Sequence, residues 1–402
     1  MRTLLSSKLK FPGFILLTIT IILLGIGISI TRPFLSLYLT NVIHMSPFQL
    51  GLFMCLNALG GIIASTWLGK YSDATGARKG IMLLSSFASV LGYLAFLLLH
   101  QYVLLLIVTT LLLGLGSSTF PQIFAYARES AIRTRQQDAT FAVSTLRSFF
   151  SLAWVIGPLA GATLLSISGF HGLFLITASL FLIAFFIVLW RLQNTKNQST
   201  PHQRPKDPIS LWKTLKRWDV FAASIAFIFA NSALSMNGLY MPLLVTKAIG
   251  APQSTVGIVA SLSAFLEIPI IILLGSIVGR FKKRSMLLIG CLSATIYYFG
   301  MAFSHSALEV LLLQIVCAIN VSVLVSIGMS YFQDFLPHAP GTTTTLYSNT
   351  SNLGSLIGSI GGGLVAQLID FRFVFVLCGI LALSALFFLY IGKTKKPEQL
   401  LP

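Results

Sequence analysis

The chain has 402 residues, of which 55% are hydrophobic and only 9% are charged. Soluble domains carry roughly 25% charged residues, and the mean hydropathy here is +0.88. A water-soluble enzyme is therefore excluded. The apolar residues form long unbroken blocks and do not alternate with polar ones, which also argues against a transmembrane β-barrel.

Twelve apolar blocks are each long enough to cross the hydrocarbon as a helix, which takes about 20 residues. The first follows a short basic start and is expected to be a retained helix rather than a cleaved signal peptide. We therefore predict an all-α membrane protein with twelve transmembrane helices, at residues 14–39, 48–69, 80–99, 103–128, 138–165, 170–190, 219–243, 254–278, 285–303, 307–331, 342–367 and 371–391.

The formal net charge of +17 is distributed as in a membrane protein and not as in a nucleic-acid-binding protein. If the N-terminus is cytoplasmic, 23 of the 27 Lys and Arg residues lie in cytoplasmic segments, and only Lys247 and Arg372 lie in the opposite loops. Under the positive-inside rule, both termini are predicted to be cytoplasmic. The only long gap is polar and proline-containing, which predicts two bundles, 1–192 and 218–402, joined by a cytoplasmic linker, 193–217.

The two halves repeat at an offset of about 205 residues. Tyr126-Ala-Arg-Glu129 ends the fourth predicted helix, and Tyr331-Phe-Gln-Asp334 ends the tenth. Similar pairs open and close the second and eighth helices. This pattern predicts two pseudo-symmetric six-helix bundles with a binding site between them, an arrangement typical of transporters that work by alternating access.

The connection after the second predicted helix contains Gly69, Asp73, Gly76, Arg78 and Lys79. We expect Gly69 to allow close helix packing, Asp73 to accept bonds from a neighbouring helix N-terminus, and Gly76 to permit a tight turn. Arg78 and Lys79 would hold the loop at the cytoplasmic face. The spacing resembles the signature loop of the major facilitator superfamily, which implies that fold and a gating role. The alternative is an ordinary basic cytoplasmic loop.

Charged residues inside predicted spans are the strongest functional signal, because burying them in a bilayer is costly. They are Arg32, Arg147 and Glu267, together with Glu129 at the end of the fourth predicted helix. Arg147 follows Glu129 by eighteen residues and precedes Trp154 by seven, which resembles the sugar-binding residues of lactose permease. The resemblance implies that these three residues bind a sugar. The alternatives are an ion pair of Glu129 with Arg128 or Arg133, and simple packing of Trp154.

Glu267 lies two residues before Pro269 in the eighth predicted helix and is our predicted proton-coupling and substrate-binding residue. Carboxylates at such depths serve proton relays. The tenth helix lacks the His and Glu that lactose permease carries there. In-membrane amides can both donate to and accept from sugar hydroxyls, although they can equally join helices; the candidates are Asn57, Gln122, Asn231, Asn237, Asn320 and Asn352.

Two stretches, Phe120–Glu129 and Leu146–Pro158, resemble the sugar efflux transporters of this superfamily. The resemblance implies export of mono- or disaccharides or glycosides across a bacterial inner membrane, by alternating access and exchange with protons. Gly157-Pro158-x-x-Gly161 looks like a motif of exporters, although a kink without directional meaning explains it nearly as well. A multidrug exporter of the same superfamily is the alternative function. The four cysteines form no metal or redox motif, and we expect no cofactor and a monomer.

Overall fold

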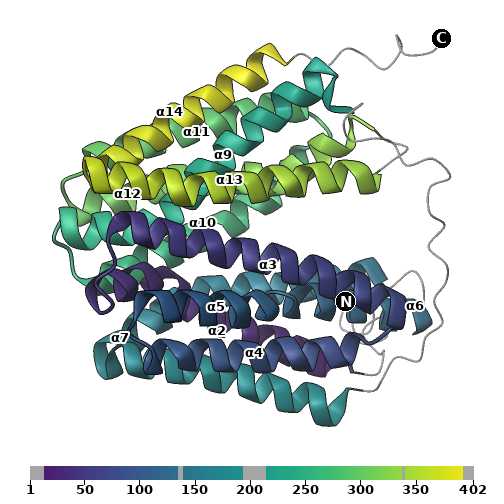
Figure 1. Ribbon diagram of the computed structural model, residues 1–402. Helices are drawn as coiled ribbons and strands as arrows, with labels where there is room; N and C mark the ends of the chain where they lie inside the picture. Colours follow the sequence, from purple (N-terminus) through teal and green to yellow (C-terminus); the bar gives the residue numbers. More distant parts are fainter. Residues whose placement is uncertain (1–12, 135–138, 193–213, 337–339, 393–402) are drawn as a thin grey trace, which may run out of the picture. The chain divides into compact units, whose positions relative to one another are not determined.

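A computed structural model describes residues 13–134, 139–192, 214–336 and 340–392 (Figure 1). These residues form helices and no strands. The helices are α2 (Phe14–Asn41), α3 (Pro47–Thr75), α4 (Arg78–Leu98), α5 (Tyr102–Gly116), α6 (Thr119–Thr134), α7 (Ala139–Arg191), α9 (Trp218–Leu243), the π-helical η2 (Leu244–Ala248), α10 (Gln253–Ile277), α11 (Lys283–Phe303), α12 (Ala307–Gln333), α13 (Pro340–Leu368) and α14 (Phe371–Ile391).

Ten helices among the described residues are long and apolar enough to span a membrane. The count of twelve spans stays a prediction, and the difference lies in two elements. α7 has 53 residues and contains Gly169 in a non-helical conformation (φ 63°, ψ −167°), where two helices join. It is long enough for two crossings of about 20 residues each. α13 has 29 residues but is rich in Ser, Thr and Gly, and it is not among the ten.

One predicted boundary was wrong and one is confirmed. The predicted span 103–128 matches the stretch Tyr102–Ile132, which is long and apolar enough to cross a membrane and contains a turn at Ser117–Ser118 between α5 and α6. The second predicted helix does not end at residue 69, because α3 continues as a helix to Thr75. Apolar residues mark the hydrocarbon, whereas a helix continues into the polar interface as long as its backbone bonds are made. The connection to α4 is therefore only Gly76, which has φ 70°, and Ala77.

The chain forms two compact units. Unit 1 comprises Met1–Met45 and Leu56–His202, and unit 2 comprises Ser46–Cys55 and Gln203–Pro402. The first residues of α3 thus belong to unit 2, where the Tyr240 hydroxyl donates to the Pro47 carbonyl at 3.3 Å. The predicted linker falls mostly on residues 193–213, which lie outside the described part of the chain. The linker and bundle boundaries stay predictions.

Within unit 1, α2 packs closely against both parts of α7. The Ser29 hydroxyl donates to the Ala153 carbonyl at 2.8 Å, and the Thr31 and Thr177 hydroxyls lie 2.6 Å apart. A Cβ added to Gly157 would lie 1.8 Å from the Ser29 Oγ. Gly157 therefore serves helix packing, which is the use of small residues expected in a membrane.

Within unit 2, α9 occupies the corresponding place. It packs against α13 and α14, which run beside it in Figure 1. A Cβ on Gly358 of α13 would lie 2.4 Å from the Ser232 carbonyl oxygen, and the Ser235 hydroxyl donates to the Ser355 carbonyl at 3.2 Å. Both units therefore join their first helix to later helices through small residues and hydroxyls.

The contact at Gly157 predicts a stability effect. Gly157→Ala should lower the free energy of unfolding by about 1–3 kcal/mol, because the new methyl group overpacks the contact with Ser29. Gly238→Ala is the matched control, since a Cβ at this α9 position would meet open space. It should not lower the stability, because alanine favours helices. Thermal unfolding in detergent measures both, and equal midpoints for the two variants would contradict the packing role of Gly157.

Candidate functional site

Arg147 lies in unit 1 among aromatic side chains of α6 and α7. It is exposed, and its guanidinium carbon lies 5.7 Å from the centroid of the Phe124 ring. One turn along α7, the Phe150 ring lies 4.8 Å from Phe120 and 6.4 Å from Trp154. The structure thus brings Arg147 and Trp154 onto one face of α7, with Phe150 between them.

This arrangement has the chemistry of a binding surface for neutral polar molecules. Binding sites are typically lined by aromatic groups with a few polar groups that fix orientation. A guanidinium presents a planar fork of N–H donors, and no carboxylate among the described residues forms an ion pair with Arg147 within 4 Å. Trp154 is half-buried, so part of its ring remains available for contact.

Glu129 pairs with Arg78 and forms no ion pair with Arg147, and the sugar-binding role that the resemblance implies for it stays a prediction. Its carboxylate accepts a bond from Arg78 Nε at 2.8 Å and forms an ion pair with the same guanidinium. The alternative prediction of an ion pair between Glu129 and Arg128 was wrong, because Glu129 pairs with Arg78. The side chain of Arg133, the other predicted partner, lies outside the described part of the chain. Arg78 is the first residue of α4, and from there it reaches Glu129 in the second half of α6.

Arg78 organises the whole connection between α3 and α4. Its side chain is only 11% exposed. It donates to Asp73 at 2.9 Å, to Ser72 at 3.1 Å and to Gln122 at 3.4 Å, and the Ser72 hydroxyl donates to the same Gln122 oxygen at 2.7 Å. The Gln122 side chain thus accepts hydrogen bonds within this cluster, and its role in substrate binding stays a prediction.

Two expectations for the loop need correction. A Cβ on Gly69 would meet no atom of the described chain within 4 Å, so Gly69 does not mediate close helix packing here. Asp73 is 70% exposed and is bonded to Arg78, and not to a helix N-terminus. Lys79 donates to the Leu189 carbonyl at the end of α7, at 2.9 Å. The gating role of these residues stays a prediction.

The corresponding residues of unit 2 repeat these contacts. Lys283 donates to Asp334 at 2.7 Å, at positions 205 residues after Arg78 and Glu129. Arg284 Nε donates to the Leu389 carbonyl at 2.8 Å, as Lys79 does to Leu189. The internal repeat read from the sequence is therefore also a repeat of contacts. The cluster of polar contacts in unit 2 has fewer hydrogen bonds, because the ammonium group of Lys283 replaces the guanidinium of Arg78.

Glu267 lies half-buried on α10 of unit 2, with neutral groups around it. Ser263, one turn earlier, donates to its carboxylate at 3.2 Å and lies 3.8 Å from the Cys317 sulfur. Ser322 donates to the Glu267 backbone carbonyl at 3.4 Å. Among the described residues, no Lys or Arg forms an ion pair with Glu267. The carboxylate therefore has a serine as hydrogen-bond donor and no basic partner in the described part of the chain, and its proton-coupling and substrate-binding roles stay predictions.

Two predicted amides join helices within unit 2. Asn231 donates to the Phe227 carbonyl at 2.7 Å and accepts from Ser351 at 3.2 Å, which ties α9 to α13. Asn237 accepts from the Tyr297 hydroxyl at 3.0 Å, which ties α9 to α11. These two side chains therefore join helices, as the alternative interpretation of the amides predicted. Asn57 and Asn352 are half-buried.

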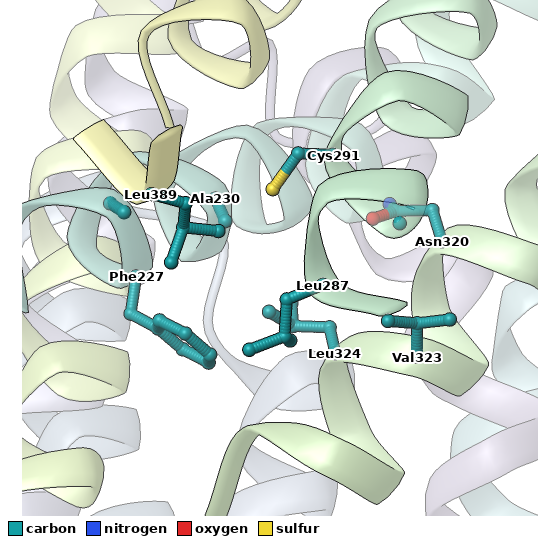
Figure 2. Close-up of a pocket in the computed structure, with 10 residues that line it drawn as sticks. Phe227, Ala230, Leu287, Cys291, Asn320, Val323, Leu324 and Leu389 are labelled. Atoms are coloured by element: carbon teal, nitrogen blue, oxygen red, sulfur yellow. The ribbon is translucent and has the colours of Figure 1, made fainter. Parts of the chain in front are cut away.

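Asn320 borders a small cavity in the core of unit 2. Figure 2 shows it at the edge of a mostly apolar group that includes Phe227, Leu287 and Leu324. The cavity measures about 10 Å³, which is the volume that one water molecule needs. It cannot hold a sugar. Substrate binding by Asn57, Asn231, Asn237, Asn320 and Asn352 stays a prediction.

The sequence analysis did not predict the phenylalanines of α6 and α7 beside Arg147, of which Phe124 contacts it. Phe120 and Phe124 are spaced by four residues on α6, and Phe150 lies one turn from Arg147 on α7. The i, i+4 spacing was a usable signal, because it places both rings on one helix face. Phenylalanine is so frequent here, with 31 copies, that spacing alone could not single these out.

Comparison with known proteins agrees with this architecture. The family model of the Major Facilitator Superfamily matches residues 17–307 and 223–402. Sugar efflux transporter A of Escherichia coli strain K12 is 30% identical over 91% of this chain and 92% of its own length. Sugar efflux transporter A of Dickeya chrysanthemi is 32% identical, with 88% and 89% covered. Proteins named for multidrug efflux or resistance match at 25% identity.

A solved structure shows the same fold. The crystal structure of a variant of the nucleoside transporter NupG superposes with a TM-score of 0.83, covering 95% of this chain and 100% of that one. The identity is 13%, so this likeness concerns the fold alone.

The two related ion pairs predict unequal contributions to stability. Arg78→Gln should lower the free energy of unfolding by about 1–3 kcal/mol, because it breaks charge-assisted bonds around a largely buried guanidinium. Lys283→Gln, the matched change in unit 2, should cost under about 1 kcal/mol, because its partner Asp334 is 56% exposed. Thermal unfolding in detergent compares the two, and a larger loss for Lys283→Gln would contradict this ranking.

Proposed function

Because the chain belongs to the Major Facilitator Superfamily, a family of transporters and not of enzymes, we propose that it exports sugars across the bacterial inner membrane. The observation that carries this proposal is the accessible guanidinium of Arg147 beside an aromatic surface. The proposal is supported by relatives named sugar efflux transporters that match nearly the whole chain at 30% identity or more. The substrates are mono- or disaccharides or glycosides, moved by alternating access.

Arg147 and Trp154 are the proposed sugar-binding residues. Two N–H groups of a guanidinium can donate to neighbouring hydroxyls of one sugar ring. The half-buried Trp154 and Phe150 offer apolar ring faces to the C–H face of the sugar. This combination suits a neutral, hydroxyl-rich ligand, because no carboxylate within 4 Å competes for the Arg147 fork among the described residues.

Glu267 is the proposed proton-coupling residue, which makes the protein a sugar–proton antiporter. Its carboxylate has a serine as hydrogen-bond donor and no basic partner among the described residues. Binding of a proton would remove a charge from the membrane span and so favour a different conformational state. Both termini are proposed to be cytoplasmic, as the distribution of Lys and Arg indicates.

A multidrug exporter is the second candidate function. Relatives named for multidrug efflux or resistance match at lower identity than the sugar efflux transporters do. A drug pocket would need mainly apolar contacts, whereas Arg147 offers several hydrogen-bond donors. A panel of radiolabelled sugars and cationic drugs on everted vesicles separates the two functions: accumulation of drugs and of no sugar would favour multidrug export.

Arg147→Lys tests the proposed sugar contact. An ammonium cannot reproduce the planar fork, so the loss of a charge-assisted bond should weaken apparent sugar affinity roughly ten- to one-hundred-fold. Accumulation of radiolabelled sugar in everted vesicles measures it. Arg128→Lys is the matched control, since Arg128 is exposed on α6 and is not assigned to the site. Unchanged affinity in Arg147→Lys would show that the sugar binds elsewhere.

Glu267→Gln tests the proposed proton coupling. The amide keeps the size and accepts from Ser263 but cannot take up a proton, so downhill sugar exchange should persist in proteoliposomes while pH-driven accumulation is lost. Glu309→Gln is the matched control, because Glu309 is an exposed helix-capping residue and glutamine also suits that position. If Glu267→Gln accumulates sugar like the parent protein, Glu267 is not the coupling residue.

A further inference from the structure

An apolar groove runs along the surface of unit 2 between α11 and α14, which lie side by side in Figure 1. It measures about 470 Å³. Three of its side chains are strongly exposed: Ile289 at 60%, Phe387 at 57% and Tyr390 at 64%. Its lining is Leu288, Ile289, Leu292, Leu383, Leu386, Phe387 and Tyr390. On a membrane span, such a surface is matched by hydrocarbon chains.

A cation lies at one end of this groove. Arg284 precedes Leu288 by four residues, so the two share one face of α11. Its Nε donates to the Leu389 carbonyl at 2.8 Å, and its Nη2 donates to the carbonyl of the groove residue Tyr390. Nη1 makes no hydrogen bond to the described residues, so this face of the guanidinium can still donate to a ligand.

Further positive charge gathers at the same end. α11 begins here at Lys283, its N-cap residue Lys282 forms no side-chain capping bond, and helix N-termini favour anions. Arg280 and Lys282 are exposed, and neither has an acidic partner among the described residues. The nearby acidic residue Asp334 is taken by Lys283 at 2.7 Å.

The corresponding end of unit 1 lacks this excess of positive charge. There, Arg78 is neutralised by Asp73 and Glu129 together. In unit 2, the position 205 residues after Asp73 is Val278, which has no charge. One of the two acidic partners is therefore missing in unit 2, while Arg280 and Lys282 stand at the positions of the uncharged Thr75 and Ala77.

We propose that this groove binds an anionic phospholipid, with its acyl chains along α11 and α14 and its phosphate beside Arg284 and Lys282. A zwitterionic lipid would bring its own ammonium against these cations and would leave them without a counter-charge. A second copy of the chain would fill the apolar part but would likewise leave the cations unmatched. Charge and apolar surface together therefore select an anionic lipid.

Native mass spectrometry of the full-length protein tests this proposal. The protein is purified in detergent and offered phosphatidylglycerol and phosphatidylethanolamine with identical chains. The parent protein should retain phosphatidylglycerol preferentially. Lys282→Gln combined with Arg284→Gln should weaken that retention roughly five-fold per neutralised cation and leave phosphatidylethanolamine unchanged. Lys216→Gln, an exposed cation before α9, is the control and should retain lipid like the parent protein.

Leu292→Trp changes no charge and fills the groove with a larger side chain. It therefore tests the proposal if the charge variants fail to fold. It should reduce retention of phosphatidylglycerol, whereas Leu312→Trp at an exposed α12 position should not. Glycerol 3-phosphate, which has the phosphate but no chains, should bind far more weakly than the lipid. Three outcomes would overturn the proposal. The protein could retain both lipids equally, it could bind glycerol 3-phosphate as tightly as the lipid, or it could form a dimer that Leu292→Trp abolishes. None of these readouts depends on sugar transport.

Discussion

Backbone hydrogen bonding inside hydrocarbon is the constraint on which the rest of this structure depends. No water is available there, so each N–H and C=O must be paired within its own segment, and helices follow. Helices in a lipid environment gain little from apolar burial against each other, so they associate through close packing and polar contacts. Gly157 against Ser29 in unit 1 and Gly358 against Ser232 in unit 2 provide that close packing.

The internal repeat preserves positions more faithfully than it preserves chemistry. Arg78 with Glu129 and Lys283 with Asp334 occupy related places, yet the arginine joins four partners and the lysine two. The two units also differ in the charged residues that they carry within the membrane spans. Unit 1 presents Arg147 on an aromatic surface, whereas unit 2 carries the half-buried Glu267. A duplicated scaffold thus lets each unit specialise without altering its helices.

Packing also explains why several polar residues in the spans are poor guides to a substrate site. An amide in hydrocarbon must find a partner, and a neighbouring helix is the nearest source. Asn231 accepts a hydrogen bond from Ser351 on α13, and Asn237 accepts one from Tyr297 on α11. Gln122 accepts from Ser72 in the cluster around Arg78. A polar residue within a span is therefore informative about ligands mainly when its partners are absent or neutral, as for Arg147 and Glu267.

Composition, apolar blocks and basic clusters by themselves determined the all-helical membrane fold, because this follows from length and hydropathy along the chain. The superfamily was predicted from the resemblance of the loop that contains Gly69, Asp73 and Arg78, and the repeat from matching motifs in the two halves. The pairing of Arg147 and Trp154 on one face also followed from their seven-residue spacing. Only the tertiary structure decided that Glu129 pairs with Arg78, that Phe124 lies against Arg147 and that Phe120 packs on Phe150. These contacts join different helices, and which helix faces which depends on packing, which has no periodic signature in the sequence.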